Sequence, residues 1–340
     1  MCTRPIVVTY SARLNKNTDS DIKVYGEKHS VLCQCGKCEE CLKQYQNDWS
    51  VRCYYELKRS NVAVFFTLTY REDSVHDVFD EETGERFTSV CKNDVQLFLK
   101  RIREARRKRG DSTDFKYFIT SEYGPTTLRS HYHGLLFFVN KFDFAEFAAD
   151  WNKKFGFVTF REISLLNSKS ALNSIRYAAK YSAKGAFENP FIMRGFVEPT
   201  FHLISKNLGS NYLTDERKRY HLALDYFPRR FAGKYTDGYL EEIRRRLVVY
   251  IDGFPYHLPR YYREKIFAKR KDLQVAYSDY VCQRVIALNA PTLVRLSTDK
   301  PYRTASKAVY EEYMQNVRAS ELRCEDARHK HSKFFTKSKI

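Results

Sequence analysis

The segment Ser130–Phe138, SHYHGLLFF, places two histidines one residue apart, directly before an apolar run. The run is rich in Leu and Phe, and it predicts a β-strand. Because successive side chains of a strand point to opposite faces, His131 and His133 would share one face, with Tyr132 on the other. We therefore predict a strand that presents two imidazoles side by side at its start.

The residues before this strand add a carboxylate to the histidine pair. Phe115–Thr120 (FKYFIT) predicts the preceding strand, and the turn-rich sequence GPTTLRS leads from it into the histidine strand. Glu122 closes the preceding strand, at hairpin distance from His131 and His133. One Glu and two His suit a divalent cation that keeps open positions for a substrate. The alternative is that both histidines are partly exposed loop residues or hydrogen-bonded core residues.

Three further segments predict the elements around this hairpin. Val62–Tyr70 (VAVFFTLTY) is β-branched and aromatic and predicts a strand. Asn93–Gly110 predicts a basic helix that Asn93 or Asp94 caps and a glycine ends. Ala171–Gly185 predicts a later helix, again closed by a glycine. The order of these elements predicts an α+β domain with a central antiparallel sheet.

The composition favours a nucleic-acid partner. The 340 residues include 59 Lys and Arg against 41 Asp and Glu, a net charge of +18, with 25 Tyr and 25 Phe. Contacts of cationic side chains with phosphates release condensed counterions, and aromatic rings can stack on bases. The alternative is a protein whose surface is simply basic.

Neither a membrane protein nor a secreted protein is indicated. The sequence lacks an apolar run of about 18 residues, and its first residues lack the long apolar stretch of a secretory signal. The nine cysteines then indicate reduced thiols in a cytoplasm. We expect no membrane association.

We divide the chain into three regions. Residues 1–60 form a cysteine-containing segment and a helix, residues 61–190 form the core with the histidine strand, and residues 191–340 form a basic accessory region with a helical C-terminal tail. The segments Asn93–Gly110 and Pro228–Lys234 are both basic. Each either holds DNA or is a solvated face.

The helix over Ala171–Gly185 carries a second constellation. Tyr177 and Tyr181 are four residues apart and share one face, beside a second four-spaced pair, Lys180 and Lys184. Aromatics at this spacing are usually core residues. Tyrosine hydroxyls are also possible nucleophiles when a metal polarises the phosphate that they attack. The lysines would then neutralise phosphate or lower a phenol pKa.

Four cysteines within nine residues form a possible zinc site: Cys33, Cys35, Cys38 and Cys41. Closely spaced thiolates suit zinc, and less often an iron–sulfur cluster. Four ligands so near in sequence are cramped, so Cys2 could replace one of them. The alternative is a group of cytoplasmic thiols without a metal.

The motifs FTLTY, HYHGLLF and YAAKY, in this order, resemble those of the HUH endonucleases. Together with CGKCEEC, SEYGPTTLRSHYHGLLFF, YAAKYSAK and PRYYREK, they are most similar to the replication initiators of microviruses, in particular the gokushovirus branch. The similarity covers roughly residues 30–265. FTLTY occupies the family's first motif, where Thr67 and Thr69 either line the cleft or pack the sheet.

The resemblance implies an HUH nickase domain with about five antiparallel strands flanked by helices. It implies that His131 and His133 bind Mg²⁺ or Mn²⁺ with Glu122 as third ligand, and that Tyr177 and Tyr181 are nucleophiles. Such initiators cut one strand of the replicative DNA at an origin and join a tyrosine to the 5′ end. The freed 3′ hydroxyl primes a host polymerase in the cytoplasm of the bacterial host.

Two other functions remain open at this stage. A two-tyrosine transposase would use the same chemistry, and a non-catalytic basic DNA-binding protein would explain the charge but not the histidines and tyrosines. The sequence has no G-x-x-x-x-G-K-[ST] motif, so we expect no P-loop motor and a need for a host helicase.

Overall fold

The computed structural model separates the chain into two units, Lys43–Gln274 and Met1–Leu42 with Val275–Ile340. Each unit is described by itself. The structure describes residues 6–11, 28–33, 35–36, 38–111, 115–124, 127–140, 144–165, 168–183, 192 and 195–294.

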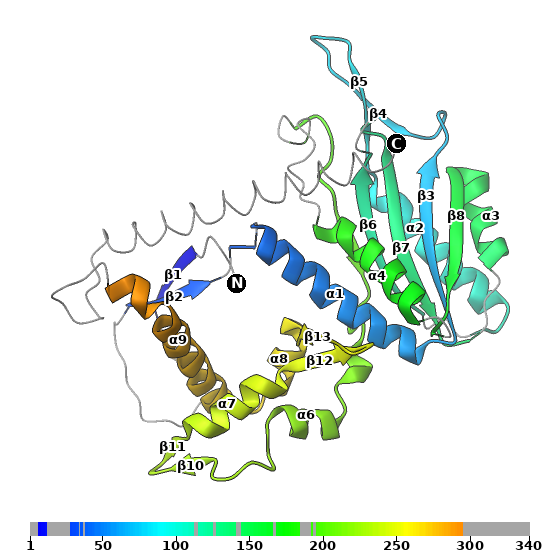
Figure 1. Cartoon of the computed structure of the whole chain (residues 1–340). Coiled ribbons are helices and arrows are strands. Elements are labelled where there is room, and N and C mark those ends of the chain that lie inside the picture. The colour runs from blue at the N-terminus through cyan, green and yellow to red at the C-terminus, as the bar shows by residue number, and fades with distance from the viewer. Residues whose placement is uncertain are drawn as a thin grey trace, which may run out of the picture. The chain divides into compact units, whose positions relative to one another are not determined.

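A five-stranded antiparallel sheet organises the larger unit (Figure 1). Its order is β8 (Gly156–Ile163), β3 (Val62–Tyr70), β7 (Ser130–Phe138), β6 (Phe115–Tyr123) and β9 (His202–Ile204). The strand with the two histidines is therefore the central one. The predicted α+β class, with a central antiparallel sheet flanked by helices, is confirmed.

Helices cover both faces of this sheet. On one face, α2 (Lys92–Lys108) and α3 (Phe144–Lys154) pack against the β-branched and aromatic side chains of β3. On the other face lie α4 (Ser168–Ala183) and α1 (Glu39–Arg59), as Figure 1 shows. The core of the first face is apolar, with these side chains buried: Val64, Phe66, Leu68, Val95, Phe98, Leu99, Ile102 and Trp151.

Helix α2 begins differently from the prediction. Its N-cap is Cys91, which makes no side-chain cap, so neither Asn93 nor Asp94 caps it. The Asp94 carboxylate instead accepts a hydrogen bond from the Tyr70 hydroxyl at 2.8 Å. The predicted glycine end is confirmed: Gly110 has φ 74°, a left-handed conformation that glycine adopts without a Cβ penalty.

The remaining elements of the larger unit are short. The predicted strand at Leu247–Ile251 is β12 (Val248–Ile251), and the segment PRYYREK forms most of α8. The others are β4 (His76–Phe79), β5 (Arg86–Ser89), η3 (Ser210–Tyr212), α6 (Asp215–His221), β10 (Arg230–Phe231), β11 (Lys234–Tyr235), α7 (Asp237–Arg246), β13 (Phe254–His257) and α8 (Arg260–Ile266).

In the smaller unit, β1 (Ile6–Ser11) pairs with β2 (Lys28–Cys33), and α9 (Lys271–Val294) runs across the boundary between the units. None of the helices that the structure describes has the length and hydrophobicity to cross a bilayer. The predicted helical tail lies outside the described residues, and the division near residues 60 and 190 stays a prediction. The sheet itself takes its fifth strand, β9, from beyond residue 190.

One glycine on the histidine strand should be essential for stability. A Cβ added at Gly134 would lie 2.4 Å from Cζ of Phe66 and 3.1 Å from Cγ1 of Ile119, both in the core. We expect Gly134→Ala to lower the free energy of unfolding by about 1–3 kcal/mol, because the rigid ring must move. Urea unfolding followed by circular dichroism measures this.

Gly124→Ala is the matched control for that substitution. The nearest atoms to a Cβ at Gly124 are 3.6 Å away, an ordinary contact. We expect this variant to unfold close to the wild-type midpoint. Equal stabilities of the two variants would contradict the packing described for Phe66.

Candidate functional site

The register of three adjacent strands brings polar side chains together on the α4 face of the sheet. Glu122 on β6 pairs directly with His131 on β7, and His133 lies between Thr120 on β6 and Thr67 on β3. Residues two apart on a strand share a face, so both imidazoles point to the same side. Glu122 and His133 are buried, and His131 is partly exposed.

The distances fit a shared cation. Oε2 of Glu122 lies 3.3 Å from Nε2 of His131 and 3.3 Å from Nε2 of His133. The ligand atoms of the three residues all lie within 4.8 Å of one another. Two ligands that each lie about 2.1 Å from one ion are separated by about 3.0–3.5 Å in octahedral or tetrahedral geometry. The predicted metal ligands are therefore adjacent, at a spacing that an ion can bridge.

The other nitrogen of each imidazole is held by a neighbour. Nδ1 of His131 lies 3.0 Å from the carbonyl oxygen of Arg129, and Nδ1 of His133 lies 2.9 Å from the Thr67 hydroxyl. A carbonyl only accepts hydrogen bonds, so Nδ1 of His131 carries a proton. In the neutral ring, Nε2 then presents a lone pair to the Glu122 carboxylate. Two such acceptors face each other stably only with a proton or a cation between them.

The two tyrosines lie beside this group. Tyr181 stacks on His133 with ring centroids 4.1 Å apart and planes inclined by 19°, and Tyr177 lies 6.0 Å from the same imidazole. The two phenol rings are perpendicular, with centroids 5.0 Å apart. Phe65 on β3 contacts both His133 and Tyr177. Helix α4 thus places both tyrosines over the histidine strand.

The two tyrosines differ in environment. The side chain of Tyr177 is 49% exposed, whereas Tyr181 is 9% exposed. Burial raises the pKa of Tyr181 above its ordinary value, and a hydrogen bond with Tyr177 and the negative charge of Glu122 raise it further. The Tyr181 phenol is therefore neutral at physiological pH. Loss of its proton requires a base or a nearby positive charge.

The other predicted site residues have mixed outcomes. Lys180 is exposed on α4, and Lys184 lies outside the described residues. Thr67 contacts His133, whereas the Thr69 hydroxyl donates to the backbone carbonyl of Phe157 at 3.5 Å. Of these two threonines, only Thr67 is thus seen to contact a candidate ligand.

A hydrogen-bond network behind the histidines was missed in the sequence. Tyr132 points to the opposite face, where its hydroxyl accepts from the Cys91 amide at 2.7 Å and lies 2.8 Å from the Tyr70 hydroxyl. Tyr70 donates to Asp94, which also lies 2.6 Å from Nε2 of His76. A tyrosine between two histidines was the available signal, because the strand alternation sends it into the core.

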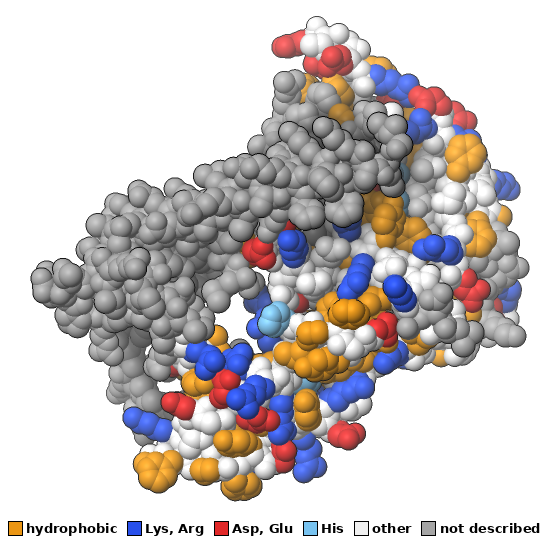
Figure 2. All heavy atoms as spheres, in the orientation of Figure 1, with side chains coloured by type: hydrophobic (Ala, Val, Ile, Leu, Met, Phe, Trp, Pro, Cys, Tyr) orange, Lys and Arg blue, Asp and Glu red, His pale blue; other side chains and the backbone are white. Residues whose placement is uncertain are grey.

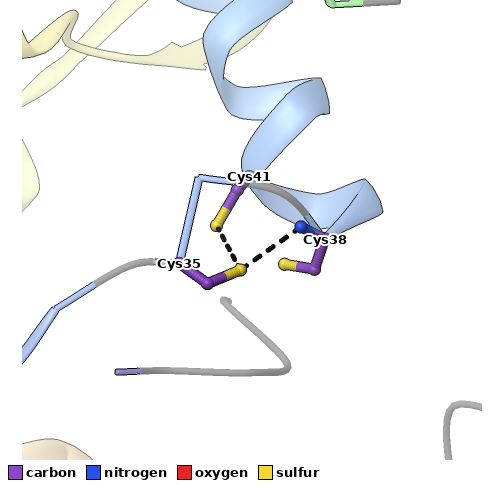
Figure 3. Close-up of side chains that lie close together, drawn as sticks. All are labelled: Cys35, Cys38 and Cys41. Atoms are coloured by element: carbon purple, nitrogen blue, oxygen red, sulfur yellow. Dashed lines mark hydrogen bonds between the residues drawn. The ribbon is translucent and has the colours of Figure 1, made fainter. Parts of the chain in front are cut away.

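Three of the four predicted zinc cysteines also come together, in the smaller unit (Figure 3). Sγ of Cys35 lies 3.9 Å from Sγ of Cys41, and the Cys38 amide donates to the Cys35 sulfur at 3.2 Å. The sulfurs of all three lie within 4.8 Å of one another. The side chain of Cys33 and all of Cys2 lie outside the described residues. This group can hold a metal through three thiolates.

Residues 63–186 match the family model of the ORF2-type replication-associated proteins. The chain is 29% identical to the replication-associated protein VP4 of Bdellovibrio phage phiMH2K over 54% of its own length and 58% of that protein. It is 25% identical to the replication-associated protein ORF2 of Spiroplasma virus 4 over 80% of its own length and 86% of that protein. No solved structure matches the chain.

The matched residues begin in β3 and end just after α4, so they include the histidine strand, Glu122 and both tyrosines. The match confirms the predicted resemblance to the replication proteins of microviruses. Over residues 63–186, the chain therefore contains a replication-associated protein domain of the ORF2 type.

Proposed function

We propose that this protein is a rolling-circle replication initiator, an HUH endonuclease that nicks and rejoins one strand of a phage genome through a phosphotyrosine intermediate. One observation carries the proposal: Tyr181 stacks on His133, which is itself 3.3 Å from Glu122. A nucleophile of the required type thus adjoins a metal-binding group. The names of the two phage relatives support a role in replication.

The donor set suits Mg²⁺ or Mn²⁺, bound by Glu122, His131 and His133. Such an ion, when bound, neutralises the non-bridging oxygens of a scissile phosphate. Thr67 and the Arg129 carbonyl orient the imidazoles. A tyrosine oxygen attacks phosphorus, the O–P bond forms, and the bond to the 3′ oxygen breaks. The 3′ oxygen takes up a proton and becomes the primer hydroxyl.

Two tyrosines allow a complete replication cycle. The 5′-phosphotyrosine keeps the energy of the phosphodiester bond, so a later 3′ hydroxyl can reseal the strand. The second tyrosine can cut the regenerated origin while the first still holds DNA. We propose that Tyr177 and Tyr181 alternate in this way, and that Lys180 and Lys184 neutralise phosphates of the bound strand.

The partners follow from this chemistry. A net charge of +18 suits the DNA backbone. The initiator would act in the cytoplasm of the bacterial host, with a host helicase to unwind beyond the nick and a host polymerase to extend the 3′ end. A two-tyrosine transposase is the alternative. A purely DNA-binding protein does not account for a carboxylate, two imidazoles and two phenols in one place.

Loss of the carboxylate should weaken the metal site. We expect Glu122→Gln to lower the affinity for Mn²⁺ by at least about tenfold, because the negative ligand is lost while the side-chain shape is kept. Isothermal titration calorimetry with Mn²⁺ measures this. Glu81→Gln, at an exposed position outside the site, should bind as the wild type does. Unchanged affinity in Glu122→Gln would contradict the proposed ligand set.

Loss of both phenol oxygens should abolish the covalent adduct. We expect a labelled single-stranded origin oligonucleotide to form a denaturation-resistant adduct with the wild type, and chelation of divalent cations to prevent it. Tyr177→Phe and Tyr181→Phe should each retain part of the adduct, and the double variant none. Tyr220→Phe, exposed and outside the domain match, is the control. An adduct in the double variant would refute the assignment.

We also propose that the cysteine group binds structural zinc, with Cys33 as fourth ligand beside Cys35, Cys38 and Cys41. Two thiolates at about 2.3 Å from a tetrahedral zinc are separated by about 3.8 Å, close to the 3.9 Å between Cys35 and Cys41. The amide that donates to the Cys35 sulfur favours a thiolate there. Cys38 and Cys41 flank the N-terminus of α1, which also favours negative charge.

Metal analysis tests the zinc site independently of any activity on DNA. We expect about one zinc per chain in protein purified without chelator, and loss of that zinc in a Cys38→Ser/Cys41→Ser variant. Cys91→Ser is the matched control, since Cys91 belongs to a separate group with His76 and Asp94. Zinc that survives the double substitution, or that disappears with Cys91→Ser, would contradict the site.

A further inference from the structure

The β10–β11 hairpin exposes aromatic side chains to an unusual degree. We call residues 227–235 the 227–235 hairpin; it comprises β10, β11 and the three residues before them. Phe227 is 73% exposed and Phe231 is 78% exposed, the two highest values among the large hydrophobic side chains of the described residues. Neither ring contributes to the core, so its exposure on a basic surface calls for a ligand.

Cations surround these rings. Residues 227–235, FPRRFAGKY, contain Arg229, Arg230 and Lys234 and no acid, a local charge of +3. The guanidinium carbon of Arg229 lies 4.9 Å from the ring centre of Phe227, and that of Arg230 lies 4.3 Å from Tyr235. Orange and blue side chains accordingly gather in Figure 2 where Figure 1 places β10 and β11.

A pocket joins the aromatic and cationic groups. Its lining is Phe227, Pro228, Arg229, Arg230, Tyr235 and Arg270. The Tyr235 hydroxyl accepts hydrogen bonds from Arg230 at 2.7 Å and from Arg270 at 3.1 Å. Asp272 pairs with Arg230 at 2.8 Å. These contacts hold two of the three guanidinium groups in place before any ligand arrives, which lowers the cost of ordering them on binding.

We propose that the 227–235 hairpin is a second DNA-binding site, one that takes single-stranded DNA. Guanidinium groups bind phosphates, and exposed aromatic rings stack on bases that are free of a partner strand. A duplex keeps its bases stacked inside, so it would leave Phe227 and Phe231 unused. The inference rests on the proposed function for DNA as the partner, and it places a strand-holding site outside the matched residues 63–186.

A second hairpin shows why exposure alone would not carry this inference. The β12–β13 hairpin also exposes two aromatics, Tyr250 at 70% and Phe254 at 64%. However, residues 248–257, VVYIDGFPYH, contain one acid and no Lys or Arg, a local charge of −1. The combination of rings and cations therefore distinguishes the 227–235 hairpin. The β12–β13 hairpin supplies a matched control.

Fluorescence anisotropy with a labelled single-stranded oligonucleotide tests the proposal. Chelator is present, so that binding is measured without cleavage. We expect Phe227→Ala/Phe231→Ala to raise the Kd at least about fivefold, because each stacked base contributes roughly 1–3 kcal/mol. Tyr250→Ala/Phe254→Ala should change it less than about twofold. Arg229→Ala should reduce the slope of log K against log salt by about 0.7, the value for one phosphate contact on a single strand.

Two results would overturn the inference. One is wild-type affinity in the Phe227→Ala/Phe231→Ala variant, whose exposed positions leave the fold intact by circular dichroism. The other is an equal loss of affinity for a duplex of the same length, which would assign the rings no role in stacking. Adduct formation at saturating DNA with Mn²⁺ should persist in these variants. Its absence in the wild type would refute the nickase proposal separately, since the anisotropy result does not depend on it.

Discussion

The antiparallel register between β6 and β7 is the constraint on which the rest of the site depends. It sets Glu122 opposite His131 and, through the pleat, keeps His133 on the same face. A shift of one residue would send both imidazoles into the core and bring Tyr132 out. The register is in turn fixed by packing, since Gly134 leaves room for the buried Phe66 ring on the opposite face. The core and the candidate metal centre therefore specify each other.

Helix α4 completes the site from above the sheet. Its apolar residues Ile175, Ala178 and Ala179 are buried, and the same packing holds Tyr181 against His133. A tyrosine placed by a helix and imidazoles placed by a strand can keep a fixed geometry only if the two elements pack rigidly. The stacked pair at 4.1 Å is that junction. A nucleophile preorganised in this way needs little rearrangement before attack.

The sequence predicted the elements with strong local patterns and missed what depends on distant contacts. Alternation around His131 and His133 predicted their shared face, and the hairpin predicted Glu122 beside them. The prediction of Asn93 or Asp94 as helix cap was wrong, because Tyr70 and His76 on other elements recruit the Asp94 carboxylate. The short strand β9 was not foreseen, since three residues carry no periodicity and their pairing with β6 is set by tertiary packing.

The central claim is that one divalent cation lies between Glu122, His131 and His133, within reach of the tyrosines. An anomalous difference map from crystals grown with Mn²⁺ tests it most directly. The account predicts a peak about 2.0–2.3 Å from Nε2 of both histidines and from a carboxylate oxygen of Glu122. A Mn²⁺ ion found only on other carboxylates, with the three side chains hydrogen-bonded to one another as they stand, would contradict it.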